Sequence, residues 1–206
     1  MAESKLWKTL HRGIEVLRKQ FLPETFDPLG RYPKSMLVQA QTRAFLVLSH
    51  AEIEGYFESW AKDIARACEV RWNASAKPTA PLSYLLTTNH AQRMNAGEKD
   101  APVWLSDAAS KAFQKYYVSI KDNNGIKEVN VLALFSPLGV PASAIGTALL
   151  ASLDSLGALR GEHAHNSSKA VRSVLDPETE YRTIRNVVDD LKSFDGWLVS
   201  YRKKVR

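Results

Sequence analysis

Cysteine is nearly absent from this chain of 206 residues, which contains only Cys68. A single thiol cannot form an internal disulfide, and it cannot supply the paired cysteines of the usual zinc sites. The N-terminal segment MAESKLWKTLHRGIEVLRK is charged throughout and lacks the apolar centre that a signal peptide needs. We therefore expect a protein of the reducing cytoplasm that has no metal site.

Charged side chains are missing between Glu128 and Asp154, the one stretch that could be mistaken for a membrane span. Proline and glycine interrupt this stretch at SPLGVP and divide it into two pieces. We expect buried helices there, and no membrane partner.

Acidic residues are fewer than basic ones, 22 against 28, so the formal net charge is +6. An excess of this size suits a polyanion such as RNA, although it also occurs on ordinary solvated surfaces. Hydrophobic residues make up 45% of the chain, which is enough to bury one sizeable core. We expect a single domain over residues 1–206.

Alternating strand patterns are also lacking, and the apolar periodicity is helical throughout. Residues 74–106 have an irregular pattern, and Ser106 looks like the N-cap of the helix that follows. Asp176 is expected to cap the final helix, with Pro177 at its first position. The other expected helices cover residues 4–21, 34–73, 106–121, 127–135 and 141–165. The fold class is therefore all-α, a bundle of about five to six helices.

The expected helix 141–165 has two different faces. One face carries large apolar side chains, at Ile145, Leu149, Leu153, Leu156 and Leu159. Another face carries small ones, at Ala144, Ala148, Ala151, Ser155 and Ala158. The first should pack into the core, and the second would let another helix approach closely, from the same chain or from a second copy.

The end of this helix, GALRGEHAHNSS, gathers charged and imidazole side chains after the long uncharged run. His163 continues the leucine face, whereas His165 continues the small-residue face. Arg160 and His165 are five residues apart, hence about 140° apart around an ideal helix. They could act together if the helix loosens near Asn166, or if two copies of the segment face each other.

An Arg followed after four residues by His at a helix end resembles the signature of the HEPN superfamily, helical domains that include many ribonucleases. The segment LFSPLGVPASAIGTALLASLDSLGALRGEHAH resembles the approach to that signature in the RiboL-PSP-type branch. The stretch RAFLVLSHAEIEGYFESWAKDI resembles the long helix of the branch, with Glu54 at the position of its usual acidic residue. The chain departs from the pattern at Gly161, where Asn is frequent, and at His163, where an aliphatic residue is common.

This resemblance implies an HEPN-like domain that cleaves RNA without a metal or other cofactor. In such a reaction the ribose 2′-OH attacks the neighbouring phosphate and leaves a 2′,3′-cyclic phosphate. His165 would be the general acid or base, because imidazole titrates near neutral pH. Arg160 would hold the phosphate and stabilise its developing charge. The resemblance also implies a homodimer, which would double this sparse site.

Four further residues are candidates for supporting roles, namely Glu162, His163, Glu54 and His50. Simpler interpretations remain open for the motif. Arg160 could be a surface partner of Glu162 or Asp154, His163 a core or interface histidine, and His165 a C-cap. His50 and Glu54 lie one turn apart and could instead form a surface pair. A metal site built from His50, Glu54, His163 and His165 is not supported by any familiar ligand spacing.

Two classes of function therefore follow from the sequence. The first is a dimeric endoribonuclease that acts as a toxin or defence effector, held in check by an antitoxin or another partner protein. The second is a non-catalytic helical module that uses the same dimer to bind RNA or a protein. Cleavage of RNA by the purified protein in the presence of a chelator separates the two classes.

Overall fold

The computed structural model describes the backbone of residues 3–88, 101–165 and 174–205, and the side chains of these residues except 101–102 and 160–165. All regular structure in these ranges is helical. The elements are α1 (Lys5–Phe21), α2 (Ser35–Ser75), α3 (Ala80–Thr88), α4 (Ala101–Lys121), α5 (Glu128–Phe135), the 3₁₀ turn η1 (Ser136–Leu138), α6 (Ala142–Ile145), α7 (Thr147–His165) and α8 (Pro177–Val205). The all-α class is confirmed, but these ranges hold eight α-helices instead of five to six.

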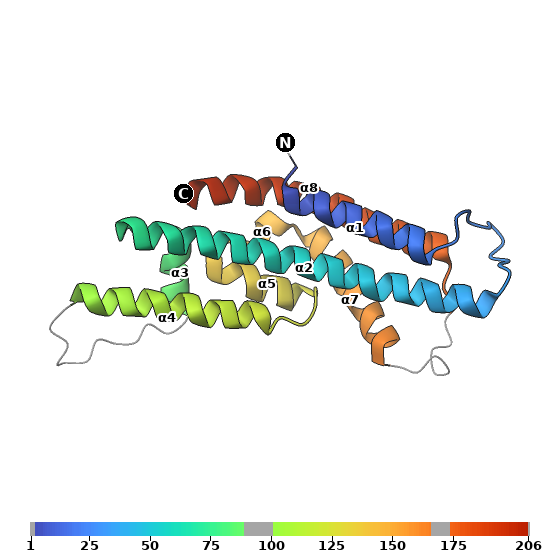
Figure 1. The fold of residues 1–206 in the computed structure, drawn as a ribbon, viewed down its shortest axis with the longest axis horizontal. Coiled ribbons are helices and arrows are strands. Elements are labelled where there is room, and N and C mark those ends of the chain that lie inside the picture. The colour runs from blue at the N-terminus through green and yellow to red at the C-terminus, as the bar shows by residue number, and fades with distance from the viewer. Residues whose placement is uncertain (1–2, 89–100, 166–173, 206) are drawn as a thin grey trace.

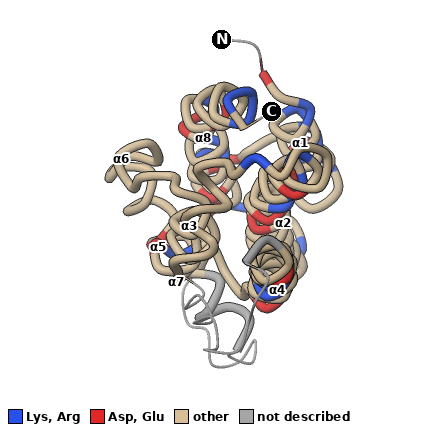
Figure 2. The backbone as a smooth tube through the Cα atoms, turned by 90° about the vertical axis from the view of Figure 1, so that its left-hand side faces the viewer, with Lys and Arg blue, Asp and Glu red and all other residues tan. Residues whose placement is uncertain are grey.

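The helices form an elongated bundle around α2, which runs along the length of the molecule (Figure 1). Helices α1 and α8 cover one side of α2, and α4 lies along the opposite side (Figures 1 and 2). Helix α2 packs against all of its long neighbours, α1, α4, α7 and α8. Its buried side chains extend from Thr42 to Trp72, so it forms the centre of the hydrophobic core.

Asp195 of α8 connects three helices through a buried carboxylate that is 1% exposed. It accepts hydrogen bonds from the Ser4 backbone N–H (2.9 Å) and the Ser4 hydroxyl (2.6 Å). It also accepts from the Tyr56 hydroxyl (3.1 Å) and the Trp60 indole N–H (3.0 Å) of α2. Ser4 in turn caps α1, since its Oγ accepts from the Trp7 backbone N–H at 2.9 Å. Burial, together with the neighbouring Asp195, raises the pKa of Tyr56 well above its usual range, which keeps this hydroxyl a donor.

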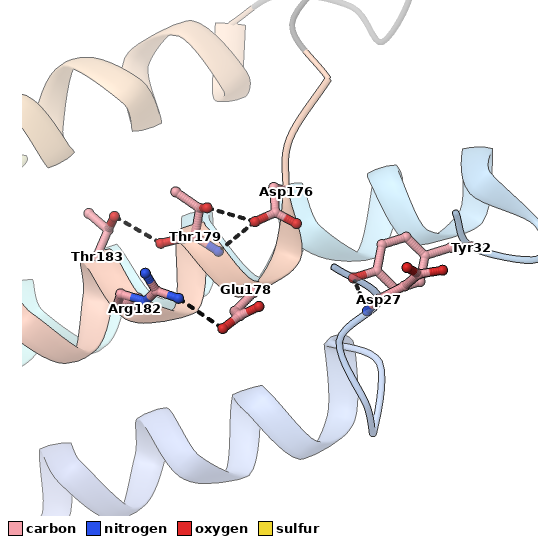
Figure 3. Close-up of polar contacts among 7 residues, drawn as sticks. All are labelled: Asp27, Tyr32, Asp176, Glu178, Thr179, Arg182 and Thr183. Atoms are coloured by element: carbon pink, nitrogen blue, oxygen red, sulfur yellow. Dashed lines mark hydrogen bonds and ion pairs between the residues drawn. The ribbon is translucent and has the colours of Figure 1, made fainter. Parts of the chain in front are cut away.

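The start of α8 is fixed by local hydrogen bonds (Figure 3). Asp176 accepts from both the backbone N–H (3.0 Å) and the hydroxyl (2.6 Å) of Thr179, which confirms the expected cap. The preceding residue, Leu175, exchanges two hydrogen bonds with the Gln39 side chain of α2, at 2.7 and 2.8 Å. These bonds attach the beginning of α8 to the first part of α2.

The expected helix 141–165 is wrong in one respect, because the structure divides it at Gly146. This residue has φ 90° and ψ 136°, a conformation that strongly favours glycine, and it separates α6 from α7. Pro141 precedes α6 at the N-cap position. Ala144 therefore belongs to a different helix from the remainder of the small-residue face, which starts at Ala148.

The region 74–106 also differs from the expectation. Residues 80–88 form α3, whose Pro81 is compatible with the first turn because the first N–H groups of a helix have no intrahelical partner. Helix α4 already begins at Ala101, so Ser106 lies inside it and is not an N-cap. Helix α3 and the division at Gly146 together account for the two helices beyond the six expected.

The apolar stretch between Glu128 and Asp154 contributes buried side chains from several short elements, including Val131, Phe135, Leu138 and Leu149. Among the described helices, none combines the length and the apolar character needed to cross a bilayer. Cys68 lies in the core, where burial raises the pKa of its thiol to about 11. The thiol therefore remains protonated and is a poor nucleophile.

Candidate functional site

The candidate motif occupies the last turns of α7. The backbone is helical through Arg160, Glu162, His163 and His165, whose side chains lie outside the described part of the structure. Because the helix continues through both positions, Arg160 and His165 keep an angular separation of about 140°. Asn166, where loosening of the helix was considered, also lies outside the described residues.

Helix α7 is fixed in the bundle along its leucine face. Leu149, Leu153 and Leu156 are buried, at 5%, 0% and 1% exposure. The Asp154 carboxylate accepts a hydrogen bond from the Glu128 backbone N–H at 2.6 Å and thereby satisfies a free N–H group at the start of α5. These contacts hold the middle of α7, so they also set the direction in which its last turns point.

The small-residue face of α7 is exposed to solvent within the single chain. Ala148, Ala151, Ser155 and Ala158 are all exposed, as expected for a face that does not pack inside the monomer. The last turns of α7 lie on the side of α2 away from α1 and α8 (Figure 1). The backbone at the end of α7 therefore lies on the side of the molecule that α4 also occupies.

The structure brings His50 and Glu54 together on α2, with His50 Nδ1 and Glu54 Oε2 3.8 Å apart. This pair is more deeply placed than the surface pair considered from the sequence, because His50 is 2% and Glu54 17% exposed. Glu54 Oε1 also accepts a hydrogen bond from the Gly125 backbone N–H. The carboxylate thus joins α2 to the turn that follows α4.

Two residues of this neighbourhood were not identified from the sequence. The Asn123 side-chain amide donates to Glu58 Oε1 at 3.0 Å and lies 3.5 Å from Glu54 Oε1, so it links the two glutamates. Position 58 follows position 54 by one helical turn, as 54 follows 50, and this spacing was the available signal. Asn123 gave no such signal, because it lies in the turn after α4, far away in the sequence from Glu54 and Glu58.

Within the described residues, no group of three or more His, Cys, Asp and Glu side chains is arranged to hold a metal ion. Two of the four residues considered for such a site, His163 and His165, have side chains outside that part. The residue types of the motif, a permanently charged Arg160 and the imidazole of His165, therefore define the chemistry that the site offers.

Comparison with known families identifies the chain as a helical domain of the HEPN type. The RiboL-PSP-HEPN family model matches residues 18–199, so the chain belongs to this family. The match includes α2, the turn around Asn123 and the whole of α7. No curated protein and no solved structure matches the chain.

Proposed function

We propose that this protein is an endoribonuclease that works as a dimer and needs no metal ion. The observation that carries the proposal is the position of the Arg160–His165 segment, at the helical end of α7 and inside the stretch that matches the RiboL-PSP-HEPN model. Membership of this family supports a function in RNA or nucleotide chemistry. The net charge of +6 is consistent with a polyanionic substrate.

In the proposed reaction the ribose 2′-OH attacks the adjacent phosphorus while His165 accepts its proton. The bond between phosphorus and the 5′-oxygen breaks, and the departing oxygen takes up a proton from a second imidazole or from water. The products are a 2′,3′-cyclic phosphate and a 5′-OH. Arg160 donates to the non-bridging phosphate oxygens, which gain charge in the transition state.

A dimer solves the geometric difficulty that Arg160 and His165 point about 140° apart on one helix. If two α7 helices meet along their exposed small-residue faces, each copy contributes its own Arg160 and His165 near a two-fold axis. The absence of large side chains on that face allows close approach of the two backbones. The working pair can then come from both copies.

We further propose that His50 and Glu54 support the site from α2, and that Glu162 and His163 support it from α7. The Glu54 carboxylate is suited to a positioning role, because the Gly125 N–H group fixes one of its oxygens. His50 is too buried to contact a substrate in this conformation, so its role would act through Glu54. The proposal thus separates two groups that touch RNA from four that hold them in place.

Cleavage by three purified variants, in the presence of chelator, tests the proposal. Arg160→Ala and His165→Ala should each lower the cleavage rate at least about a hundredfold, the scale of losing one transition-state donor or acid–base group. His163→Leu introduces the aliphatic side chain that is common at this position and tests the weaker supporting role, so this variant should retain most of the activity. The product should carry a 2′,3′-cyclic phosphate by mass spectrometry.

A wild-type rate in all three variants would contradict the proposal, and so would cleavage that EDTA abolishes. Binding of RNA without any cleavage would assign the non-catalytic alternative. If the nuclease is active, it requires restraint in the cell that makes it. We therefore propose a cytoplasmic toxin or defence effector whose partner protein inhibits it.

A further inference from the structure

A groove between α2 and α4 lies outside the motif and consists of two adjoining hollows. The first, of about 300 Å³, is lined by Lys62, Arg66, Glu69, Val70, Asn73 and Tyr117. The second, of about 410 Å³, is lined by Glu58, Ser59, Lys62, Tyr117, Ile120 and Lys121. Both hollows share Lys62 and Tyr117, so they form one continuous feature, which we call the α2–α4 groove. From Glu58 to Asn73 its α2 wall extends about 22 Å along the helix.

The exposed charges of the groove are positive. Lys62, Arg66 and Lys121 are exposed, and none of the three forms an ion pair with another residue in the described ranges. The two carboxylates, Glu58 and Glu69, are half-buried. Because the cations face solvent and the carboxylates lie deeper, an approaching polyanion meets the cations first.

Each of the two carboxylates accepts a hydrogen bond from a neutral side chain. Glu58 accepts a hydrogen bond from the Asn123 amide at 3.0 Å, and Glu69 accepts one from the Tyr117 hydroxyl at 2.8 Å. These bonds direct the carboxylate oxygens at the walls of the groove and leave the three cations available to a ligand. The charge distribution therefore favours phosphates.

Tyr117 provides an aromatic side chain between the cations. It is half-buried, it lines both hollows, and its hydroxyl is fixed by Glu69. Burial raises the pKa of Tyr117 above its usual range, and the hydrogen bond to Glu69 adds to the effect, so the ring remains neutral. A groove with cations along a backbone path and an aromatic ring for a base is the arrangement that binds single-stranded nucleic acid.

The groove also leads toward the His50–Glu54 pair of α2. Its Glu58 end is joined through Asn123 to Glu54, which pairs with His50. A strand that lies in the groove would therefore reach the neighbourhood of Glu54 at one end, while its other end would lie near Asn73 at the C-terminal part of α2. Nucleotides on one side of the cleaved bond could occupy this path.

We propose that the α2–α4 groove binds a single-stranded segment of RNA, with Lys62, Arg66 and Lys121 on phosphates and Tyr117 against a base. The proposal rests on the proposed function for the identity of RNA as the substrate, but binding in the groove does not require cleavage. A duplex is excluded from this mode because its bases are paired and stacked on each other, so none is free to pack on Tyr117.

Fluorescence anisotropy with an uncleavable RNA tests the proposal directly. The probe is a labelled 2′-O-methyl oligonucleotide of about 12 nucleotides, within the site sizes of single-strand binding grooves. The triple variant Lys62→Gln/Arg66→Gln/Lys121→Gln should bind it at least about tenfold more weakly. The slope of log Kd against log salt should fall by about 2, because three phosphate contacts each contribute about 0.7.

A second variant separates the aromatic contribution from the charges. Tyr117→Leu should weaken binding by about tenfold, the scale of losing one stacked base, and should leave the salt slope unchanged. A duplex of the same sequence should bind more weakly than the single strand. Equal affinity for duplex and single strand would overturn the assignment to single-stranded RNA.

A matched control lies on α1, which packs against α2 and α8 on the other side of the bundle. Lys5, Arg12 and Lys19 are exposed there, and none forms an ion pair within the described ranges. The triple variant Lys5→Gln/Arg12→Gln/Lys19→Gln removes the same charge and should retain wild-type affinity within about twofold. An equal loss in both triple variants would show that net charge, and not the groove, determines binding.

The outcomes distinguish this proposal from the proposed function. If the wild type binds the uncleavable RNA in the groove but never cleaves natural RNA, the nuclease proposal fails and the groove stands. If the wild type cleaves RNA and the groove variants bind and cleave like it, the groove proposal fails and the nuclease stands. If the wild type does not bind single-stranded RNA, the groove proposal is overturned.

Discussion

Helices α7 and α8 both pack against α2, but they complete their contacts in different ways. Helix α8 buries an apolar stripe that runs from Ile184 to Leu198, and Asp195 within it satisfies donors from two other segments. Arg202 near its end pairs with Asp63 of α2. The apolar stripe of α8, its buried carboxylate and Arg202 thus all find their partners within one chain.

Helix α7 buries its leucines but exposes its other face of small side chains. It begins directly after a glycine in a strained conformation and ends in the Arg160–His165 segment. The comparison indicates that α8 serves the stability of the fold, whereas α7 combines a buried structural face with an exposed face of small side chains. Substitutions on the two helices should therefore separate stability from activity.

The largest effect on stability is expected for Asp195→Asn. The amide keeps the shape of the side chain but replaces one of the two accepting oxygens by a donor. Either the Ser4 backbone N–H loses its acceptor, or the Ser4 hydroxyl, Tyr56 and Trp60 lose theirs. We expect a loss of about 3 kcal/mol in the free energy of unfolding. Urea denaturation measures it. Asp190→Asn, at an exposed position of the same helix, is the control and should change stability by less than about 0.5 kcal/mol. A similar stability for both variants would contradict the role of the Asp195 cluster.

A smaller effect is expected for Gly146→Ala, at the junction that begins α7. No atom lies within 4 Å of an added Cβ there, so the cost comes from the backbone conformation alone. We expect a loss of about 1–2 kcal/mol in the free energy of unfolding. Gly55→Ala is the matched control, because Gly55 is helical and its added Cβ also meets no atom within 4 Å. It should stabilise the protein by about 0.5–1 kcal/mol. Two changes of the same sign in urea denaturation would contradict this account.

The extents of α1, α2 and α8 could be predicted closely from the sequence, because their apolar stripes are local patterns. Ser4 and Asp176 act as caps through residues three positions away. The break at Gly146 could not be predicted in the same way, since an isolated glycine is tolerated within a helix and only the fold imposes its φ of 90°. Helix α3 is hard to predict from the sequence, because Pro78 just before it and Pro81 within it are typical of loops.

The polar clusters were harder to predict than the helices. The contact between His50 and Glu54 follows from their spacing, but its burial depends on what packs over α2. Asp195 looks like an ordinary polar position of α8, because Ser4 is 191 residues away and Trp60 is 135 residues away. The α2–α4 groove could not be predicted either, because its lining residues come from two helices that only the tertiary structure brings side by side. The Arg160–His165 motif was found because it is contained in six consecutive residues.

The smallest effect on monomer stability, and a large effect on assembly, is expected for Ala151→Glu on the small-residue face of α7. Ala151 is exposed, so the monomer should change by less than about 0.5 kcal/mol in its free energy of unfolding. If two α7 helices meet along this face, the longer side chain prevents close approach of the backbones and places two negative charges across the two-fold axis. We expect a monomer by light scattering at micromolar concentration, and a loss of RNA cleavage that parallels the loss of the dimer.

Ala133→Glu is the matched control, because Ala133 is an exposed alanine on α5 and receives the same charge. It should remain dimeric and active. A dimeric, active Ala151→Glu variant would place the interface elsewhere, and a wild type that cleaves RNA as a monomer would remove the need for a shared site. Loss of the dimer without loss of cleavage would show that one chain can bring Arg160 and His165 together. The helix between positions 160 and 165 would then have to depart from regular geometry.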